Sequence, residues 1–381
     1  MENCIVRHWL ALGYLVLLTG LFWVANGSLF TKFYYGLIAA PALFALIVAP
    51  HNLRPILREP MVLAFLVFSA WLLLSLSWTR ADDGLGGLAK RPLYVFMMFA
   101  ACALIACKDE QLLLKTLRIG AMLAALAALI NLYFHFTSPS AGERLIGTGA
   151  LRNPLLTSHV LGFFCMYWIA AWLTRSERHD WLPVVFALPL LAALLATGSR
   201  TPLLALTLTS LWMLPMIGRR ALYLIAALAL AAGVCMVLAP DLLLQRGLSF
   251  RPQLWNEAIR QASEQLWIGH GYDSQFAFNI KGLGWTLSDP HNVELAVLLE
   301  LGLVGLSLWL LMYGLILLRC LQQRHQGKFQ LASALIVYGL AAGLSEGSNF
   351  LSRPNESWFL IWIPLSLVAA LSISQRLQSK S

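Results

Sequence analysis

A histidine near the start of an apolar run has the clearest catalytic potential in this sequence. In Asp289-Pro290-His291-Asn292, aspartate is a favoured helix N-cap and proline fits the first helical position, so we expect His291 in the first helical turn. The helix dipole disfavours an imidazolium there, and a neutral imidazole can accept a proton. The position suits a general base, with Glu294 one turn later to orient the ring. The alternative is a histidine that caps the helix or contacts lipid headgroups.

Arginines supply a second kind of chemistry. Arg200 lies in TGSRTPLL, a tight polar break between two apolar runs. Its planar fork of donors suits a phosphate, although a structural ion pair is equally compatible with this position. Arg251 precedes Pro252, which begins another predicted helix, and a helix N-terminus directs amide donors at an anion. Arg246, five residues upstream, is a rival for the same role. The alternative for both is a solvated loop arginine.

Acidic residues in or beside apolar segments need a partner, because an isolated carboxylate is costly near lipid. Glu300 and Glu346 are of this kind, and Glu346 is a candidate partner for the arginine or the histidine above. Asn292 completes the set of supporting residues beside the histidine. Two other histidines, His159 and His270, are secondary candidates.

Composition places these residues in a membrane protein. The chain of 381 residues is 59% hydrophobic and 12% charged, whereas soluble domains carry about 25% charged residues. The net charge of +9 is not gathered in basic runs with interleaved aromatics, so we do not expect nucleic-acid binding. No phosphate-binding glycine loop, dinucleotide fingerprint or metal-ligand spacing occurs, so we expect neither a cofactor nor a metal.

Apolar runs of spanning length predict an all-α, polytopic membrane protein with about twelve transmembrane helices. The first run is expected to be retained, because no convincing signal-cleavage site follows it. The predicted helices cover residues 9–26, 34–49, 61–78, 92–107, 116–137, 154–173, 182–198, 202–217, 221–238, 292–318, 329–348 and 358–374.

Charge asymmetry predicts the orientation. With the N-terminus inside and the chain alternating, the inner segments hold 15 basic and 6 acidic residues, and the outer segments hold 12 of each. The whole excess of +9 then lies on the inner side, as the positive-inside rule requires. We therefore expect an inner-membrane protein with both termini in the cytoplasm and with the candidate residues facing the periplasm.

The longest outer segment, 239–290, lies between the ninth and tenth predicted helices of a single membrane domain covering 1–381. It is expected to contain an amphipathic helix that starts at Pro252 and ends at Gly269. The apolar face of that helix would comprise Leu254, Ala258, Ile259, Ala262 and Leu266. Membrane lipid is an expected partner, and three outer basic residues are assigned to its headgroups: Arg80, Lys90 and Arg91.

Three segments in order resemble the O-antigen ligase and polymerase superfamily of bacterial envelope glycan assembly. They are TGSRTPLLAL at 197–206, RPQLWNEAI with a downstream GHGYDSQF at 251–276, and DPHNVELAVLLELGLVG at 289–305. The resemblance covers the second half of the chain, and the first half matches only in hydropathy.

This resemblance implies the transfer of a glycan from undecaprenyl diphosphate to a sugar hydroxyl of the lipid A core, with inversion and without metal or nucleotide. Arg200 and Arg251 would hold the diphosphate, with Arg246 as the rival second ligand, and His291 would deprotonate the acceptor.

Two other functions remain open from the sequence. A polymerase of the same superfamily would use the same lipid-linked donor but would join repeat units to each other. A transporter or flippase for lipid-linked glycans would also have about twelve helices. Transporters usually carry ionisable groups near the membrane midplane, whereas here they gather at the outer rim.

Overall fold

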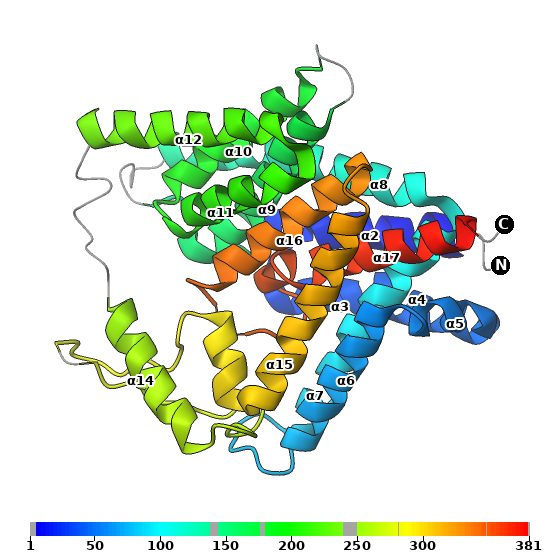
Figure 1. Ribbon diagram of the computed structural model, residues 1–381, viewed down its shortest axis with the longest axis vertical. Helices are drawn as coiled ribbons and strands as arrows, with labels where there is room; N and C mark the ends of the chain where they lie inside the picture. Colours follow the sequence, from blue (N-terminus) through cyan, green and yellow to red (C-terminus); the bar gives the residue numbers. More distant parts are fainter. Residues whose placement is uncertain are drawn as a thin grey trace.

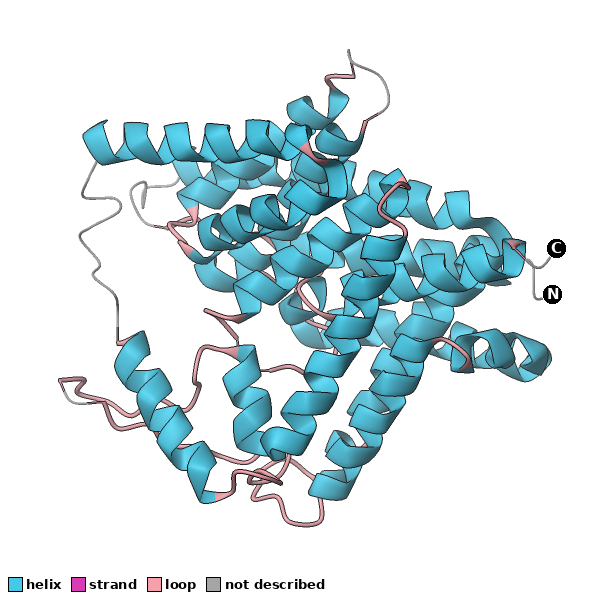
Figure 2. Ribbon diagram, in the orientation of Figure 1, coloured by secondary structure: helices cyan, strands magenta, loops and turns pink. Residues whose placement is uncertain are grey.

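The computed structural model describes residues 5–137, 144–175, 180–238, 250–280, 282–347 and 349–379. Over these ranges the chain is helical, and its only strand-like pairing is an antiparallel bridge between Phe278 and Leu287 (Figure 2). The elements are η1 Ile5–Leu10, α2 Ala11–Thr19, η2 Gly20–Phe22, α3 Gly27–Tyr34, η3 Tyr35–Ala39, α4 Ala40–Val48, η4 Pro50–Asn52, α5 Leu53–Leu57, α6 Pro60–Ser75, α7 Leu85–Leu88, α8 Arg91–Thr137, α9 Pro154–Thr174, α10 Leu182–Ala196, α11 Thr201–Ile217, α12 Arg219–Leu238, α14 Arg251–Glu264, α15 Val293–Gln322, α16 Gly327–Gly343, η5 Glu356–Phe359 and α17 Trp362–Gln378.

Each of the twelve predicted segments contains helix, so the all-α prediction is confirmed. Within the described ranges, six helical stretches are long and apolar enough to cross a membrane, and a seventh is added if the pair α5–α6, bent by 90°, counts as one. These findings are those of a polytopic membrane protein. The count of twelve spans stays a prediction.

Two predicted helices are joined in the structure. The segments 92–107 and 116–137 both lie in α8, which is interrupted at Asp109, where φ is −159° and ψ is 95°. The Asp109 carboxylate accepts a hydrogen bond from the backbone N–H of Leu112 at 3.0 Å, so it caps the second half of α8. The residues predicted to form an inner loop instead complete the helix on either side of this break.

A predicted continuous helix, 292–318, is broken in the structure. Within α15, Gly302 has φ +67°, a left-handed conformation that glycine adopts without strain. The segment that follows α14 docks at this break: the N–H groups of Leu303 and Val304 donate to the carbonyls of Leu266 and Trp267 at 2.8 and 3.3 Å. The residues from Leu266 to Gly271 thereby satisfy backbone groups that the break leaves without helical partners.

The same docking satisfies the carbonyl side of the break. The N–H groups of His270 and Gly271 donate to the carbonyls of Leu299 and Glu300, each at 2.9 Å. An added Cβ at Gly302 would meet the carbonyl oxygen of Trp267 at 2.3 Å, so no larger residue fits there. The broken helix and the segment from Leu266 to Gly271 therefore form one unit.

The amphipathic helix is present, with different limits. α14 starts at Arg251 and ends at Glu264, before the predicted end at Gly269. Leu254, Ala258 and Ala262 are buried against Phe278, Ile280 and Leu299, as a satellite core. Two residues assigned to the buried face are exposed, Ile259 by 52% and Leu266 by 39%, because they lie beyond the edge of this contact.

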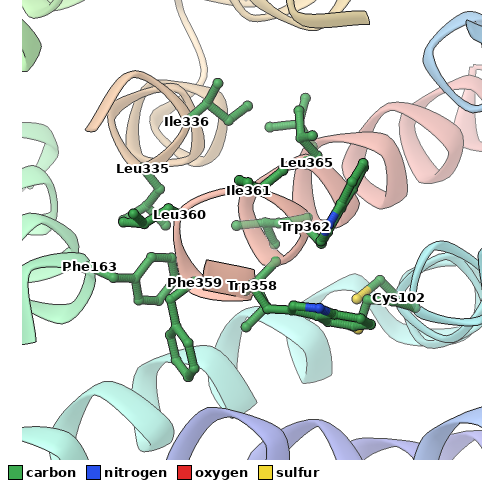
Figure 3. Close-up of a cluster of buried hydrophobic side chains, with 14 of the residues drawn as sticks. Cys102, Phe163, Leu335, Ile336, Trp358, Phe359, Leu360, Ile361, Trp362 and Leu365 are labelled. Atoms are coloured by element: carbon green, nitrogen blue, oxygen red, sulfur yellow. The ribbon is translucent and has the colours of Figure 1, made fainter. Parts of the chain in front are cut away.

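The main core surrounds the last helix. The segment Glu356–Gln378 is almost wholly enclosed by other helices. Phe359 packs against Phe163 and Trp358 lies beside Cys102 (Figure 3), while the Trp362 ring packs against Trp309. α17 contacts α8 and α16 along its length. The chain from residue 349 to α17 is thereby fixed at the centre of the bundle, where it forms one wall of the site described next.

The arrangement separates two ends of the molecule. In Figure 1 the end of α17 lies at the right, and α7 and α14 lie at the bottom. α15 packs against α6, and α11 packs against α16. The candidate residues are carried by the starts of α14 and α11, the approach to α15 and the turn after α16.

Candidate functional site

His291 lies before α15 and not within its first turn. Its φ of +49° is a left-handed conformation, which is strained for a residue with a side chain. The Asp289 carboxylate accepts a hydrogen bond from the His291 N–H at 2.6 Å and so stabilises a turn. The predicted cap at Asp289 is wrong, because the N-cap of α15 is Asn292.

Asn292, the next residue, fixes the position of His291 through two hydrogen bonds. Its Oδ1 accepts a hydrogen bond from the Leu295 N–H at 2.9 Å, and its Nδ2 donates to the Leu344 carbonyl at 2.9 Å. This side chain therefore caps α15 and ties it to the end of α16. Leu344 is two residues before Glu346, so the tie holds His291 and Glu346 close together.

A buried carboxylate joins the candidate base to a candidate anion ligand. One Glu346 oxygen accepts a hydrogen bond from the Arg251 guanidinium, and the other lies 3.6 Å from Nδ1 of His291. The Glu346 side chain is 4% exposed, whereas Arg251 and His291 are 32% and 36% exposed. Nδ1 also lies 3.7 Å from Asp289. Two acids thus face one ring nitrogen, which leaves Nε2 to accept a proton.

Burial raises the pKa of Glu346 above its ordinary value, and its contacts with Arg251 and His291 offset part of that rise. The ion pair with Arg251 offsets the free-energy cost of removing the Glu346 carboxylate from water. Glu346 was predicted to lie in the eleventh helix, 329–348, but α16 ends at Gly343 and Glu346 lies in the following turn. The left-handed Gly347, with φ +87°, directs the chain away.

The backbone at Arg200 passes near this group. It precedes α11 directly, and the hydroxyl of Ser345, the residue before Glu346, donates to the hydroxyl of Thr201 at 3.3 Å. The tight turn before it contains Gly198 with φ +61°. Arg144 of the preceding connection donates to the Thr197 carbonyl at 2.6 Å and braces this turn, a role that the sequence did not indicate.

Two predicted members of the site lie elsewhere. Glu294 has no ion pair or hydrogen bond with His291 in the described part of the chain; it lines a cavity beside Asp289 and Glu346. Arg246 lies outside the described residues.

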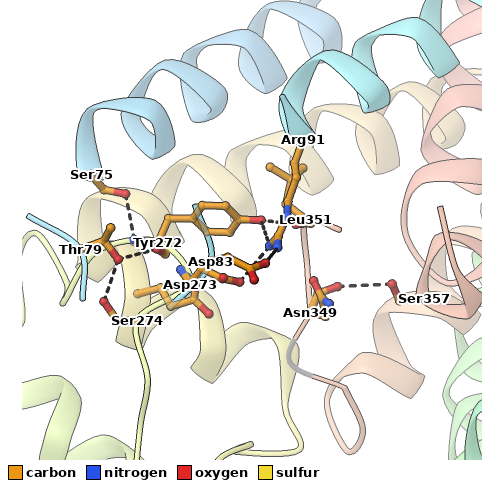
Figure 4. Close-up of polar contacts among 11 residues, drawn as sticks. Ser75, Thr79, Asp83, Arg91, Tyr272, Asp273, Ser274, Asn349, Leu351 and Ser357 are labelled. Atoms are coloured by element: carbon orange, nitrogen blue, oxygen red, sulfur yellow. Dashed lines mark hydrogen bonds and ion pairs between the residues drawn. The ribbon is translucent and has the colours of Figure 1, made fainter. Parts of the chain in front are cut away.

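A second charged cluster involves Arg91, which the sequence assigned to lipid headgroups. The structure corrects this: its guanidinium pairs with Asp83 and Asp273, each at 2.8 Å, and donates to the Tyr272 hydroxyl at 2.9 Å (Figure 4). Tyr272 in turn donates to the Leu351 carbonyl, and burial raises its pKa. The motif GHGYDSQF carried these partners, but nothing local linked it to a residue 182 positions earlier.

Two cavities flank Asp289. One, of about 210 Å³, is bounded by α9, the first turns of α15, the end of α16 and the segment leading to α17. The other, of about 240 Å³, is lined by polar groups from the Arg91 side, including Asp273, Ser274 and Glu300. Asp289 and Asn349 line both. The arrangement can bind an anion at the arginines, hold neutral groups on either side of an acid, and accept a proton at the histidine.

Comparison with known proteins identifies a matching family. Residues 182–310, which include Arg200, Arg251 and His291, match the family model described as O-antigen ligase. A protein of Pseudomonas aeruginosa named O-antigen ligase is 44% identical over 378 residues, covering 98% of this chain and 93% of that protein. This sequence similarity also covers the first half of the chain, where the sequence analysis found no family motif.

Proposed function

The chain belongs to the O-antigen ligase family, and from this premise we propose that it joins O-antigen polysaccharide, carried on undecaprenyl diphosphate, to a sugar hydroxyl of the lipid A core. The protein is then a glycosyltransferase of lipopolysaccharide assembly. The observation that carries the proposal is the contact of Glu346 with both Arg251 and His291, with Arg200 close by.

The arginines act on the leaving group. As the bond between the anomeric carbon and the phosphate oxygen breaks, negative charge develops on the diphosphate. Two guanidinium groups, from Arg200 and Arg251, stabilise that charge with donors already in place. Glu346 holds Arg251 in position and offsets part of its charge, so the diphosphate product can leave.

The histidine acts on the acceptor. Nδ1 of His291 faces Glu346 and Asp289, which favours the tautomer with its proton on Nδ1. Nε2 then takes the proton from the acceptor hydroxyl as the oxygen attacks the anomeric carbon. The electron pair of the broken bond goes to the phosphate oxygen, and the configuration at the anomeric carbon inverts. The polar cavity beside Arg91 offers the acceptor sugar a place across Asp289 from the arginines.

The membrane placement is part of the proposal. We assign twelve spans, both termini to the cytoplasm, and the site with the outer segment 239–290 to the periplasmic face of the inner membrane. The distribution of basic residues supports this assignment. We treat 1–381 as one membrane domain.

Reconstitution tests the activity. Purified protein in vesicles receives undecaprenyl-diphosphate-linked O-antigen with or without lipid A core. We expect a covalent product on the core only when both are present. Longer chains on the lipid carrier without core would identify a polymerase, and movement of the donor across the membrane without transfer would identify a flippase; either result overturns the proposal. A deletion strain should accumulate polymer on its carrier and display uncapped core.

A further inference from the structure

The 210 Å³ cavity, which we call the His159 cavity, has polar groups that the mechanism above does not use. His159 of α9 lines it and is 2% exposed, and neither ring nitrogen has a hydrogen-bond partner among the described residues. Glu294 and Glu346 line the same cavity. Oε2 of Glu294 has no hydrogen-bond partner among the described residues, whereas Oε2 of Glu346 faces Nδ1 of His291 at 3.6 Å. Polar side chains from three elements thus meet around one space.

Buried polar groups without hydrogen bonds destabilise the folded protein unless a ligand or water binds to them. Leaving one buried donor or acceptor unsatisfied costs about 1–3 kcal/mol, and three such atoms occur here, two on His159 and one on Glu294. The cavity volume of about 210 Å³ compares with ~30 Å³ for one water in the liquid, so the space admits a ring-sized group. These observations indicate a binding site and not a packing defect.

The walls define the chemistry of the occupant. Leu156, Leu340 and Leu360 form apolar surfaces between the polar groups. Apolar walls with a few convergent hydrogen-bonding groups suit a neutral ring that carries hydroxyls. An anion is disfavoured, because Glu294, Glu346 and Glu356 all line the cavity.

Position relates the cavity to the reaction. Glu346 forms its wall and also binds Arg251, which we assign to the diphosphate. The first sugar of the donor is joined to the diphosphate by a single C–O–P linkage, so it must lie beside the groups that bind the diphosphate. We propose, on the basis of the proposed function, that the His159 cavity holds this first donor sugar, with His159 hydrogen-bonded to one of its hydroxyls and Glu294 accepting from another.

Two ligands separate sugar recognition from diphosphate binding. Binding to the purified full-length protein is measured with undecaprenyl diphosphate and with undecaprenyl diphosphate bearing a single N-acetylhexosamine. His159→Leu should weaken binding of the sugar-bearing ligand by about 5- to 30-fold and leave binding of the sugar-free ligand unchanged. His159→Gln should restore part of the loss, since an amide can both donate and accept.

Controls keep the test decisive. His325→Leu replaces an exposed histidine between α15 and α16 and should change neither affinity. If His159→Leu does not fold, Glu294→Gln is measured with the same ligands, and a selective loss for the sugar-bearing one is expected. Equal weakening of both ligands, or of neither, by a folded variant overturns the inference.

Transfer assays distinguish this inference from the proposed function. In His159→Leu the KM for the lipid-linked donor should rise while the KM for the core stays the same. If the wild type transfers glycan but the variant shows no selective donor effect, only the cavity assignment fails. If the wild type transfers nothing, the proposed function fails, and the binding measurements still decide the cavity.

Discussion

Two arginine clusters lie on the side of the molecule assigned to the periplasm, and they differ in how their guanidinium groups are used. Arg91 is 11% exposed, and Asp83, Asp273 and Tyr272 surround it (Figure 4). Arg251 is 32% exposed and shares the single buried carboxylate of Glu346 with His291. The first cluster ties α8 to the segment after α14. The second leaves a cation and a base partly exposed beside Glu346, which lines a cavity.

The difference teaches how a structural arginine is distinguished from one that binds a ligand. Both carry the same charge and both pair with acids. In the Arg91 cluster the acids outnumber the cation, so an incoming anion meets net negative charge. Near the Arg251 cluster, the backbone of a second cation, Arg200, is brought close by the hydrogen bond between Thr201 and Ser345. The Arg251 guanidinium and the His291 imidazole are each about one-third exposed. Substitutions in the Arg251 cluster should therefore affect transfer most, and those in the Arg91 cluster should affect stability more than transfer.

The largest effect is expected for His291→Ala. Losing the base should lower the rate of transfer by about 10²- to 10⁴-fold, because general-base catalysis contributes on this scale. The protein should still insert and accumulate, since the turn at Asp289 uses the backbone N–H of residue 291. Initial transfer rates measure the loss of catalysis, and the amount of protein in the membrane fraction measures insertion. Full activity would remove the proposed base and the functional distinction between the clusters.

Arg200→Lys should lower the transfer rate by about 10- to 100-fold. Lysine keeps the positive charge but lacks the planar fork that binds a phosphate with two hydrogen bonds. The separate variant Arg251→Lys should lower the transfer rate to a similar extent and should also raise the apparent Kd for undecaprenyl diphosphate. Wild-type rates in the Arg200 variant would place this residue with Arg91 as a structural arginine.

Arg91→Met should affect stability more than catalysis. It leaves Asp273 without its cation and removes a donor from Tyr272, so we expect a loss of about 1–3 kcal/mol in stability, given that Asp83 is exposed. Activity per folded molecule should change by no more than about threefold. Thermal unfolding in detergent and transfer per folded protein are the measurements. A Tm like that of the wild type with a large loss of rate would move Arg91 into the catalytic cluster.

The sequence anticipated the helices better than the contacts between them. Apolar runs place helices because bilayer length and backbone hydrogen bonding act locally. The break at Gly302 was missed because the segment from Leu266 to Gly271 docks there and supplies its hydrogen bonds.

The candidate site shows the same limit. Arg200, Arg251 and His291 were found from local signals: a tight turn, a proline and a helix start. The partnership of Arg251 with Glu346 spans 95 positions, and that of Arg91 with Asp273 spans 182. A single sequence carries no local trace of such pairs, so Arg91 was assigned to lipid.

The smallest effect is expected at an ion pair that belongs to neither cluster. Glu257 on α14 accepts hydrogen bonds from Arg260 and Gln261, and these lower its pKa to about 2. The unfolded chain binds the proton near pH 4.3, so the stabilisation is present above that pH and is lost as the pH falls toward 2. Because Arg260 is 61% exposed, solvent and salt screen the pair and keep the effect small.

Glu257→Gln isolates this contribution. The variant should show a slightly lower Tm than the wild type at pH 7, a difference that narrows as the pH falls below 4 and also narrows in 1 M salt. Transfer activity at pH 7 should be unchanged, because Glu257 contacts neither arginine cluster. Parallel Tm curves for the two proteins across this pH range would contradict the assigned pKa. A loss of transfer would instead show that α14 affects the site through residues other than Arg251, because Glu257 contacts neither arginine cluster.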